Sequence, residues 1–219
     1  GIMKKTIAYI DGYNLYYGLL KGRPENKWLD PFALVKRLLR PDHDIVAVKF
    51  FTARIRPYPQ DVVAIERQKI YLQALAALGN VEITEGFYNK KKVWAPHISG
   101  KCRDCEEARN GMARVMKLEE KRSDVNIAVS AMLDAARSAA DCFVMITGDS
   151  DQVGTIEALR YEFGKPVLVF NPHVAVSEHL KRASSYYAHI PPSMPAECQM
   201  PDVIQLPNGS TLHRPPAWS

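Results

Sequence analysis

Short segments made almost entirely of apolar residues recur along this chain and alternate with segments of helical pattern. Cys142–Ile146 and residues 166–170 are two of them, and neither shows the polar alternation of a strand that faces water on one side. Strands of this kind are covered by helices on both faces, as in parallel sheets. Because strand and helix patterns alternate, the sequence predicts an α/β fold with a mostly parallel central sheet.

Periodicity and helix-capping residues predict the other elements. Asp30 followed by Pro31 predicts a helix start, because aspartate caps the first turn and proline fits the first helical position. Further strands are predicted over residues 5–11, 45–52, 81–87, 91–94 (a short edge strand) and 185–190. Helices are predicted over residues 14–20, 30–39, 59–78, 124–136, 153–163 and 176–182, with a helix resuming by Met112 after an irregular stretch from 95 to 110.

A change of composition divides the chain near residue 190. The 219 residues are enough for one domain with a substantial core, which we place at residues 1–190. Residues 191–219 hold seven prolines and few charges, and Asn208-Gly209 among them is a β-hairpin signal. We expect this C-terminal extension to pack on the body or on a partner subunit, so a homodimer could form through it.

The expected cellular location and the state of the cysteines rest on apolar runs and on cysteine spacing. No run approaches the roughly 20 apolar residues that span a bilayer, and the N-terminus lacks a signal-peptide pattern, so we expect a cytoplasmic protein without membrane contact. Cys102 and Cys105 have the spacing of half a zinc site, with His97 upstream, but no second Cys-x-x-Cys completes it. We favour free thiols there, and an inert core position for Cys142.

Acidic residues follow two of the predicted buried strands. Asp11 ends the first strand, and Asp149 and Asp151 come shortly after Cys142–Ile146. The carboxyl ends of parallel strands open on one rim of the sheet, where α/β folds bind ligands, so these carboxylates should converge. Taken alone, Asp151 could also be a helix N-cap and Asp149 a turn residue. Grouped carboxylates, however, repel one another and favour a bound cation.

Two more residues extend this candidate site. Asp124 stands in the first turn of the helix predicted over 124–136, and the Asn14 amide could orient a water molecule or a phosphate oxygen. Mg²⁺ or Mn²⁺ suits such ligands, because hard cations prefer carboxylate and water oxygens. An ion of this kind can activate water and stabilise an in-line displacement at phosphorus.

Three segments resemble the signature stretches of the NYN domain, in particular its LabA-like bacterial branch: YIDGYNL (9–15), EKRSDVNIA (120–128) and ITGDSD (146–151). They occur in the family's order, and the similarity extends over about residues 5–190. The resemblance implies a PIN-like three-layer α/β/α sandwich and metal-dependent ribonuclease activity. It also implies metal binding by Asp11, Asp124, Asp149 and Asp151, with Asn14 adjacent. Gln152 replaces an aromatic residue or leucine of many members, which changes the local packing.

Positive charge indicates a polyanionic partner. The formal net charge is +5, and residues 89–123 alone contain ten Lys or Arg against five acids. Three lysines followed by Trp94 suit single-stranded nucleic acid, although Trp94 could equally be edge packing and the charges a solvated face. The candidate RNA contacts are Arg54, Arg56, Lys90, Lys91, Lys92, Trp94, Lys121 and Arg122.

These features favour a metal-dependent ribonuclease that hydrolyses RNA phosphodiester bonds at a four-aspartate site. One alternative is a non-catalytic module that binds RNA or protein with the same surface. Another is hydrolysis of a small phosphate ester at the same centre. The chain lacks a Gly-x-Ser-x-Gly elbow, a Gly-x-Gly-x-x-Gly fingerprint and a P-loop, and its six histidines lack metal-ligand spacing, so we expect them at surface or packing positions.

Overall fold

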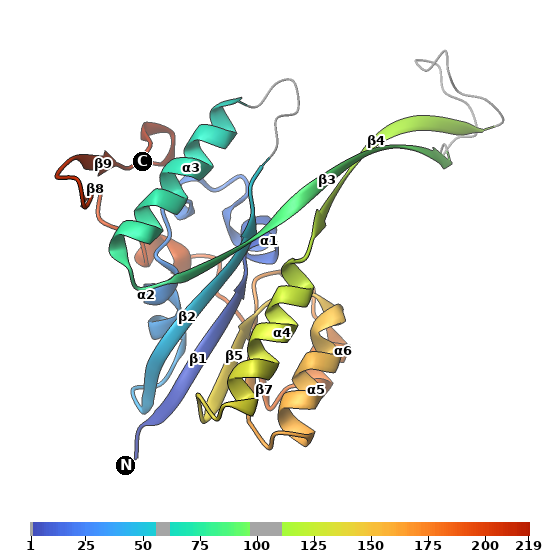
Figure 1. Cartoon of the computed structure of the whole chain (residues 1–219), viewed down its shortest axis with the longest axis vertical. Coiled ribbons are helices and arrows are strands. Elements are labelled where there is room, and N and C mark those ends of the chain that lie inside the picture. The colour runs from blue at the N-terminus through green and yellow to red at the C-terminus, as the bar shows by residue number, and fades with distance from the viewer. Residues whose placement is uncertain (1, 56–61, 97–110) are drawn as a thin grey trace.

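The computed structural model describes residues 2–55, 62–96 and 111–219 of the chain. Its central sheet has seven strands in the order β4-β3-β2-β1-β5-β6-β7 (Figure 1). They are β1 (Lys4–Asp11), β2 (His43–Ala53), β3 (Glu82–Pro96), β4 (Met112–Lys121), β5 (Cys142–Ile146), β6 (Val167–Asn171) and β7 (Tyr186–His189). Every pairing is parallel except that of β3 with β4. The predicted α/β fold with a mostly parallel sheet is confirmed.

Helices connect these strands, much as the periodicity indicates. They are α1 (Gly12–Leu15), which continues into a π-helical turn (Tyr16–Leu20), α2 (Pro31–Leu38), α3 (Val62–Leu78), α4 (Ser123–Ala136), α5 (Val153–Tyr161) and α6 (Glu178–Ala183). The predicted cap of α2 is present, because the Asp30 carboxylate accepts hydrogen bonds from the backbone N–H groups of Phe32 and Ala33. Among the described residues, no helix is long and apolar enough to cross a membrane.

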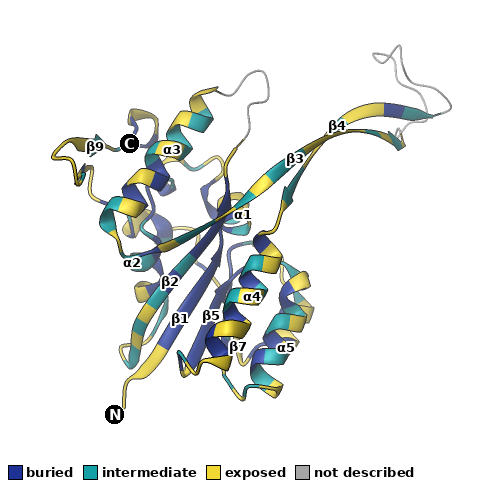
Figure 2. Cartoon of the chain, in the orientation of Figure 1, coloured by how far each residue is buried: buried dark blue, intermediate teal, exposed yellow. Residues whose placement is uncertain are grey.

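Successive side chains of the central strand β1 belong alternately to two apolar clusters. Ala8 and Ile10 of β1 belong to the cluster that includes residues of α2 and α3. Ile7 and Tyr9 belong to the cluster that includes residues of α4, α5 and α6. Successive strand residues point to opposite faces of a sheet, so both faces of β1 are packed. Figure 2 shows β5 as buried throughout and β1 as buried beyond its exposed start.

Two predictions for the segment after residue 90 are wrong. The predicted edge strand over 91–94 is part of β3, which runs unbroken from Glu82 to Pro96, and the helix predicted from Met112 is the strand β4. The two strands pair from Phe87 opposite Lys121 to Pro96 opposite Met112, and they leave the body as a ribbon (Figure 1). Lys, Glu, Met and Leu favour helices intrinsically, but pairing with β3 overrides that preference here.

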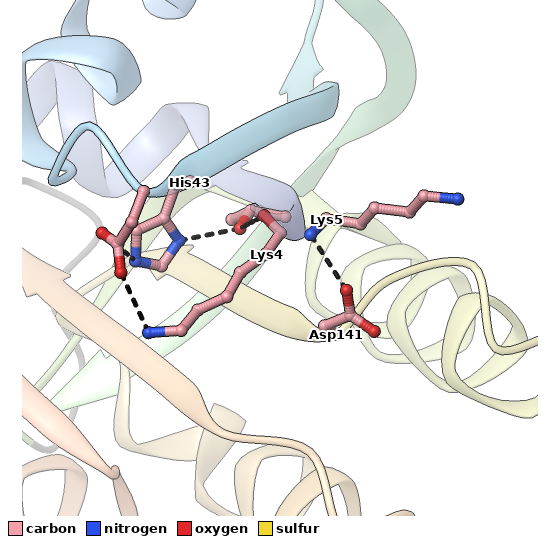
Figure 3. Close-up of polar contacts among 6 residues, drawn as sticks. Lys4, Lys5, His43 and Asp141 are labelled. Atoms are coloured by element: carbon pink, nitrogen blue, oxygen red, sulfur yellow. Dashed lines mark hydrogen bonds and ion pairs between the residues drawn. The ribbon is translucent and has the colours of Figure 1, made fainter. Parts of the chain in front are cut away.

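The other end of β1 is fixed by a polar cluster (Figure 3). The Thr6 hydroxyl lies 2.8 Å from Nδ1 of His43 at the start of β2, and the Lys5 backbone N–H donates to the Asp141 carboxylate over 3.0 Å. Burial lowers the pKa of His43, so this histidine is a neutral packing residue. These contacts hold β1, β2 and the loop before β5 together at the rim opposite the acidic residues.

The C-terminal extension packs on the body. The carbonyl of Pro201 accepts a hydrogen bond from the Trp28 indole over 2.9 Å, and the Trp218 ring lies 6.2 Å from Trp28 and 6.3 Å from Tyr71, centroid to centroid. Strands β8 (Val203–Gln205) and β9 (Thr211–His213) form the hairpin that Asn208-Gly209 indicates. Residues of this extension therefore complete the apolar cluster of α2 and α3.

Candidate metal centre

Asp11 is the most constrained acid of the site. It ends β1, is only 2% exposed and caps α1. Its carboxylate accepts the Asn14 backbone N–H over 3.0 Å, the Asn14 amide over 2.7 Å and the Thr147 hydroxyl over 3.1 Å. Burial nevertheless raises its pKa, with the Asp149 charge adding to the effect. Glycine follows because a Cβ at residue 12 would lie 2.5 Å from the Phe51 carbonyl oxygen.

Asp149 approaches Asp11 from the neighbouring strand. β1 and β5 pair in parallel with Ile10 opposite Ile146, so the chain beyond each strand leaves the sheet at the same rim. Asp149 caps the short 3-10 helix Ser150–Gln152 by accepting the Asp151 backbone N–H over 2.9 Å. The residue that caps this turn is thus Asp149, whereas Asp151 is exposed to solvent.

Asp124 completes a group of three carboxylates. The residues Asp11, Asp124 and Asp149 each place one carboxylate oxygen within 4.8 Å of an oxygen of the other two. A cavity of about 140 Å³ opens on them. Burial and then the charges of Asp11, Asp149 and Asp151 raise the pKa of Asp124 to about 6. Three convergent oxygen donors with mutual repulsion could bind a divalent cation. Asp151 is not in this group.

Asn14 serves this group indirectly. Its amide nitrogen donates to Asp11, while its amide oxygen accepts the Gly148 backbone N–H over 3.1 Å and lies 2.9 Å from Nε2 of His173. Both ends of the amide are therefore engaged by the protein. Through these contacts Asn14 orients the Asp11 carboxylate.

Two residues of the site escaped the sequence analysis. His173 follows β6 and contacts Asn14, and burial lowers its pKa. Glu120, near the end of β4, lines the same 140 Å³ cavity, accepts a hydrogen bond from the Ser123 hydroxyl and has a pKa raised by burial. Glu120 is the first residue of the 120–128 stretch, which was the available signal. Nothing in the local sequence of His173 indicates its contact with a residue 159 positions away.

Gln152 links the two segments that carry the acids. It is 1% exposed, and its side-chain N–H donates to the backbone carbonyl of Asp124 over 3.2 Å. Glutamine thus replaces apolar packing with a hydrogen bond between the 3-10 helix and α4. The Asp124 carboxylate keeps its place beside Asp149.

The predicted RNA contacts are spread over the sheet edge and the ribbon. Arg54 makes a two-pronged ion pair with Glu85, and Lys91 and Lys121 lie 3.7 and 3.0 Å from Glu119. Trp94 is 52% exposed on the ribbon, which also carries Lys90 and Lys92. Arg122 precedes α4 with a left-handed backbone (φ 81°) and places its guanidinium 4.9 Å from the Phe87 ring centre. Arg56, His97, Cys102 and Cys105 lie outside the described residues.

A larger cavity of about 740 Å³ adjoins the acidic one. Tyr13 and Glu120 line both. Aromatic side chains from α1, the π-helical turn, β2, α3, β3 and the C-terminal extension form much of its wall: Tyr13, Tyr16, Tyr17, Phe50, Tyr71, Tyr88 and Trp218. The acidic centre therefore lies at the edge of an aromatic chamber.

The repulsion at the acidic centre should appear in the pH dependence of stability. The Asp124 carboxyl holds its proton more tightly in the folded protein (pKa about 6) than at its ordinary pKa of 3.8, so its deprotonation destabilises the folded state as pH rises through this window. We expect Asp124→Asn to raise the Tm of metal-free protein near pH ~8 and to leave it nearly unchanged near pH ~4. Thermal unfolding in EDTA measures this, and a gain that is equal at both values would contradict it.

Comparison with known proteins extends these observations. Residues 5–191 match the sequence model of the NYN domain. The 6-hydroxy-3-succinoylpyridine 3-monooxygenase HspA of Pseudomonas putida is 32% identical over 242 aligned positions, covering 98% of this chain and 75% of its own length. The crystal structure of a Vibrio parahaemolyticus protein of unknown function has a TM-score of 0.50 at 19% identity, covering 86% of this chain and 94% of that one, a likeness of fold alone. This chain belongs to the NYN domain family.

Proposed function

We propose that this protein is a metal-dependent ribonuclease that hydrolyses RNA phosphodiester bonds at the acidic centre, with Mg²⁺ or Mn²⁺ held by Asp11, Asp124 and Asp149. The observation that carries the proposal is the convergence of these three carboxylates at one rim of the sheet. Membership of the NYN family supports a nuclease-like chemistry. Asp151, exposed beside Asp149, would join through the outer shell of the ion.

The donor set fits such an ion. Oxygen donors alone surround the 140 Å³ cavity, without cysteine or histidine among its lining residues, and hard divalent cations prefer this chemistry. When bound, the ion would supply an activated water and charge stabilisation for displacement at phosphorus. The chain itself fixes Asp11 through Asn14 and Thr147, so the orientation of the carboxylate is set before any ligand arrives.

The fold, family branch, cellular location and assembly of the protein are further parts of what we propose. Two apolar clusters on opposite faces of the sheet support a three-layer α/β/α arrangement of the PIN-like kind. The three signature segments support placement in the LabA-like branch. We further propose a domain over residues 1–190 with 191–219 as its extension, a cytoplasmic location, and RNA contacts through Lys90, Lys92 and Trp94 on the ribbon. Homodimer formation through the extension is a proposal that sedimentation analysis would test.

Cleavage of end-labelled single-stranded RNA tests the nuclease. The parent protein should cut in Mg²⁺ or Mn²⁺ and stop in EDTA. Salt-sensitive RNA binding without cutting under any ion would contradict the proposal and favour a non-catalytic module. Hydrolysis of an aryl phosphate by protein that neither binds nor cuts RNA would contradict it in favour of a small phosphate ester hydrolase.

The relative from Pseudomonas putida supports a second candidate, a monooxygenase acting on a hydroxylated pyridine. The 32% identity extends over 98% of this chain. Monooxygenation places one atom of O₂ in the substrate and reduces the other to water, so a two-electron reductant such as NADH must take part. Oxygen and NADH consumption that depends on 6-hydroxy-3-succinoylpyridine would favour this candidate. Their absence would count against it.

A further inference from the structure

The aromatic chamber has a shape and lining suited to a flat ring. Seven of its 22 lining residues are aromatic, whereas aromatic residues make up 9% of the chain. Tyr13 and Tyr17 lie with ring centres 4.5 Å apart, and Tyr16 meets Tyr17 edge to face at 5.2 Å. Rings that already contact one another form a rigid wall on which a planar guest stacks with little loss of side-chain freedom.

The buried part of the chamber wall is mainly apolar, and its polar lining includes tyrosine hydroxyls and charged side chains. Tyr71 is 8% exposed and its hydroxyl donates to the Leu29 carbonyl over 2.9 Å, and Trp218 is 8% exposed. Tyr13 and Tyr17 are 44% and 46% exposed, so a ligand can reach these side chains. A ring that carries nitrogen or oxygen atoms could hydrogen bond to tyrosine hydroxyls of the chamber, whereas a purely hydrocarbon ring could not.

The charges around the chamber favour an anionic group on the guest. Four basic residues line it, Lys27, Arg67, Lys117 and Lys121, against two acids, Glu119 and Glu120. Glu119 already pairs with Lys117 at 2.6 Å and with Lys121 at 3.0 Å. Lys27 lies 5.9 Å from the Tyr16 ring centre, and within the described parts of the chain no carboxylate pairs with Lys27 or Arg67, so both cations could meet an anion.

We propose that this chamber binds a planar nitrogen heteroaromatic ring that bears an anionic arm, and delivers it to the adjoining acidic centre. Tyr13 and Glu120 line both cavities, so the chamber lies beside the cavity that opens on the three carboxylates. Two sources share this chemistry. One is an unpaired base of RNA with its phosphate, a form that rests on the proposed nuclease function. The other is a free hydroxypyridine acid.

Calorimetric titration in EDTA tests binding without any catalysis. The probes are AMP, UMP and 6-hydroxynicotinate, with ribose 5-phosphate as the ringless control and adenosine as the uncharged one. We expect saturable binding of at least one ring-bearing anion and none of ribose 5-phosphate. Preference for the nucleotides assigns the ring to RNA, and preference for 6-hydroxynicotinate assigns it to a free acid. Ribose 5-phosphate binding as tightly as AMP would overturn the proposal, and so would no binding of any probe at millimolar concentration.

Variants locate the site. Tyr17→Leu keeps an apolar side chain but removes the aromatic face, and should lower the affinity for the bound probe by about tenfold or more. Its matched control is Tyr161→Leu on α5, an exposed tyrosine absent from the chamber. Lys27→Gln should weaken binding of the anionic probe and leave the affinity for adenosine unchanged. Unchanged affinity in Tyr17→Leu would overturn the proposal, whereas RNA cleavage that fails while probes still bind would refute only the nuclease.

Discussion

Asp149→Asn is expected to abolish metal-dependent RNA cleavage while the protein remains folded. The variant removes one of three carboxylates whose oxygens gather within 4.8 Å, and a neutral amide is a much poorer ligand for Mg²⁺ or Mn²⁺. We expect the rate to fall by about 10³-fold or more, an increase of about 4 kcal/mol in the barrier. Loss of a repelling charge should make the metal-free variant more stable than its parent.

The measurement is the initial rate of cleavage of end-labelled RNA, with thermal unfolding as the test of folding. Asp44→Asn is the matched control, because Asp44 is an exposed acid at the opposite end of the neighbouring strand β2. It should cut as fast as the parent. Asp151→Asn should lose less activity than Asp149→Asn, since Asp151 lies outside the group of three. Full activity in Asp149→Asn would refute the assignment of the site.

Trp218→Ala is expected to lower the free energy of unfolding by about 3–5 kcal/mol. The side chain is 8% exposed and packs against Trp28, which is fully buried, and against Tyr71. Alanine would leave a cavity between the extension and the body, and it would also remove one wall of the aromatic chamber. Urea denaturation followed by circular dichroism measures the change.

Trp94→Ala provides the control for that loss. Trp94 is 52% exposed on the ribbon, so its replacement should change the free energy of unfolding by no more than about 0.5 kcal/mol. Similar stabilities for the two variants would show that the extension contributes little to the core. A loss in Trp218→Ala alone would show that residues after 190 belong to the folded body.

The elements that the sequence predicts well are those whose signals are local. The run Cys142–Ile146 is apolar because both faces of β5 are covered, and its limits are those of the observed strand. Asp30 caps its helix as predicted, whereas the caps formed by Asp11 and Asp149 were not predicted, because the sequence suggested Asn14 and Asp151 for those positions. The convergence of Asp11 and Asp149 follows from parallel pairing, which the alternation of strands and helices already predicts.

The features that sequence reasoning missed depend on contacts between distant segments. β4 has the composition of a helix, and only its pairing with β3 makes it a strand. His173 reaches Asn14 because β6 lies beside β5, an order that no local pattern specifies. The aromatic chamber combines tyrosines of four segments with Phe50 and Trp218, so its existence could not be inferred from any one segment.

The contact between Trp28 and Trp218 also has a consequence for synthesis. The Trp218 ring that covers Trp28 lies 190 residues later in the sequence. A nascent chain on the ribosome must therefore carry an incompletely covered Trp28 and Tyr71 until Trp218 has emerged, and during this time their apolar surface is open to chaperones or to other chains. Closure of this face over such a large sequence separation should be a slow and late step of folding.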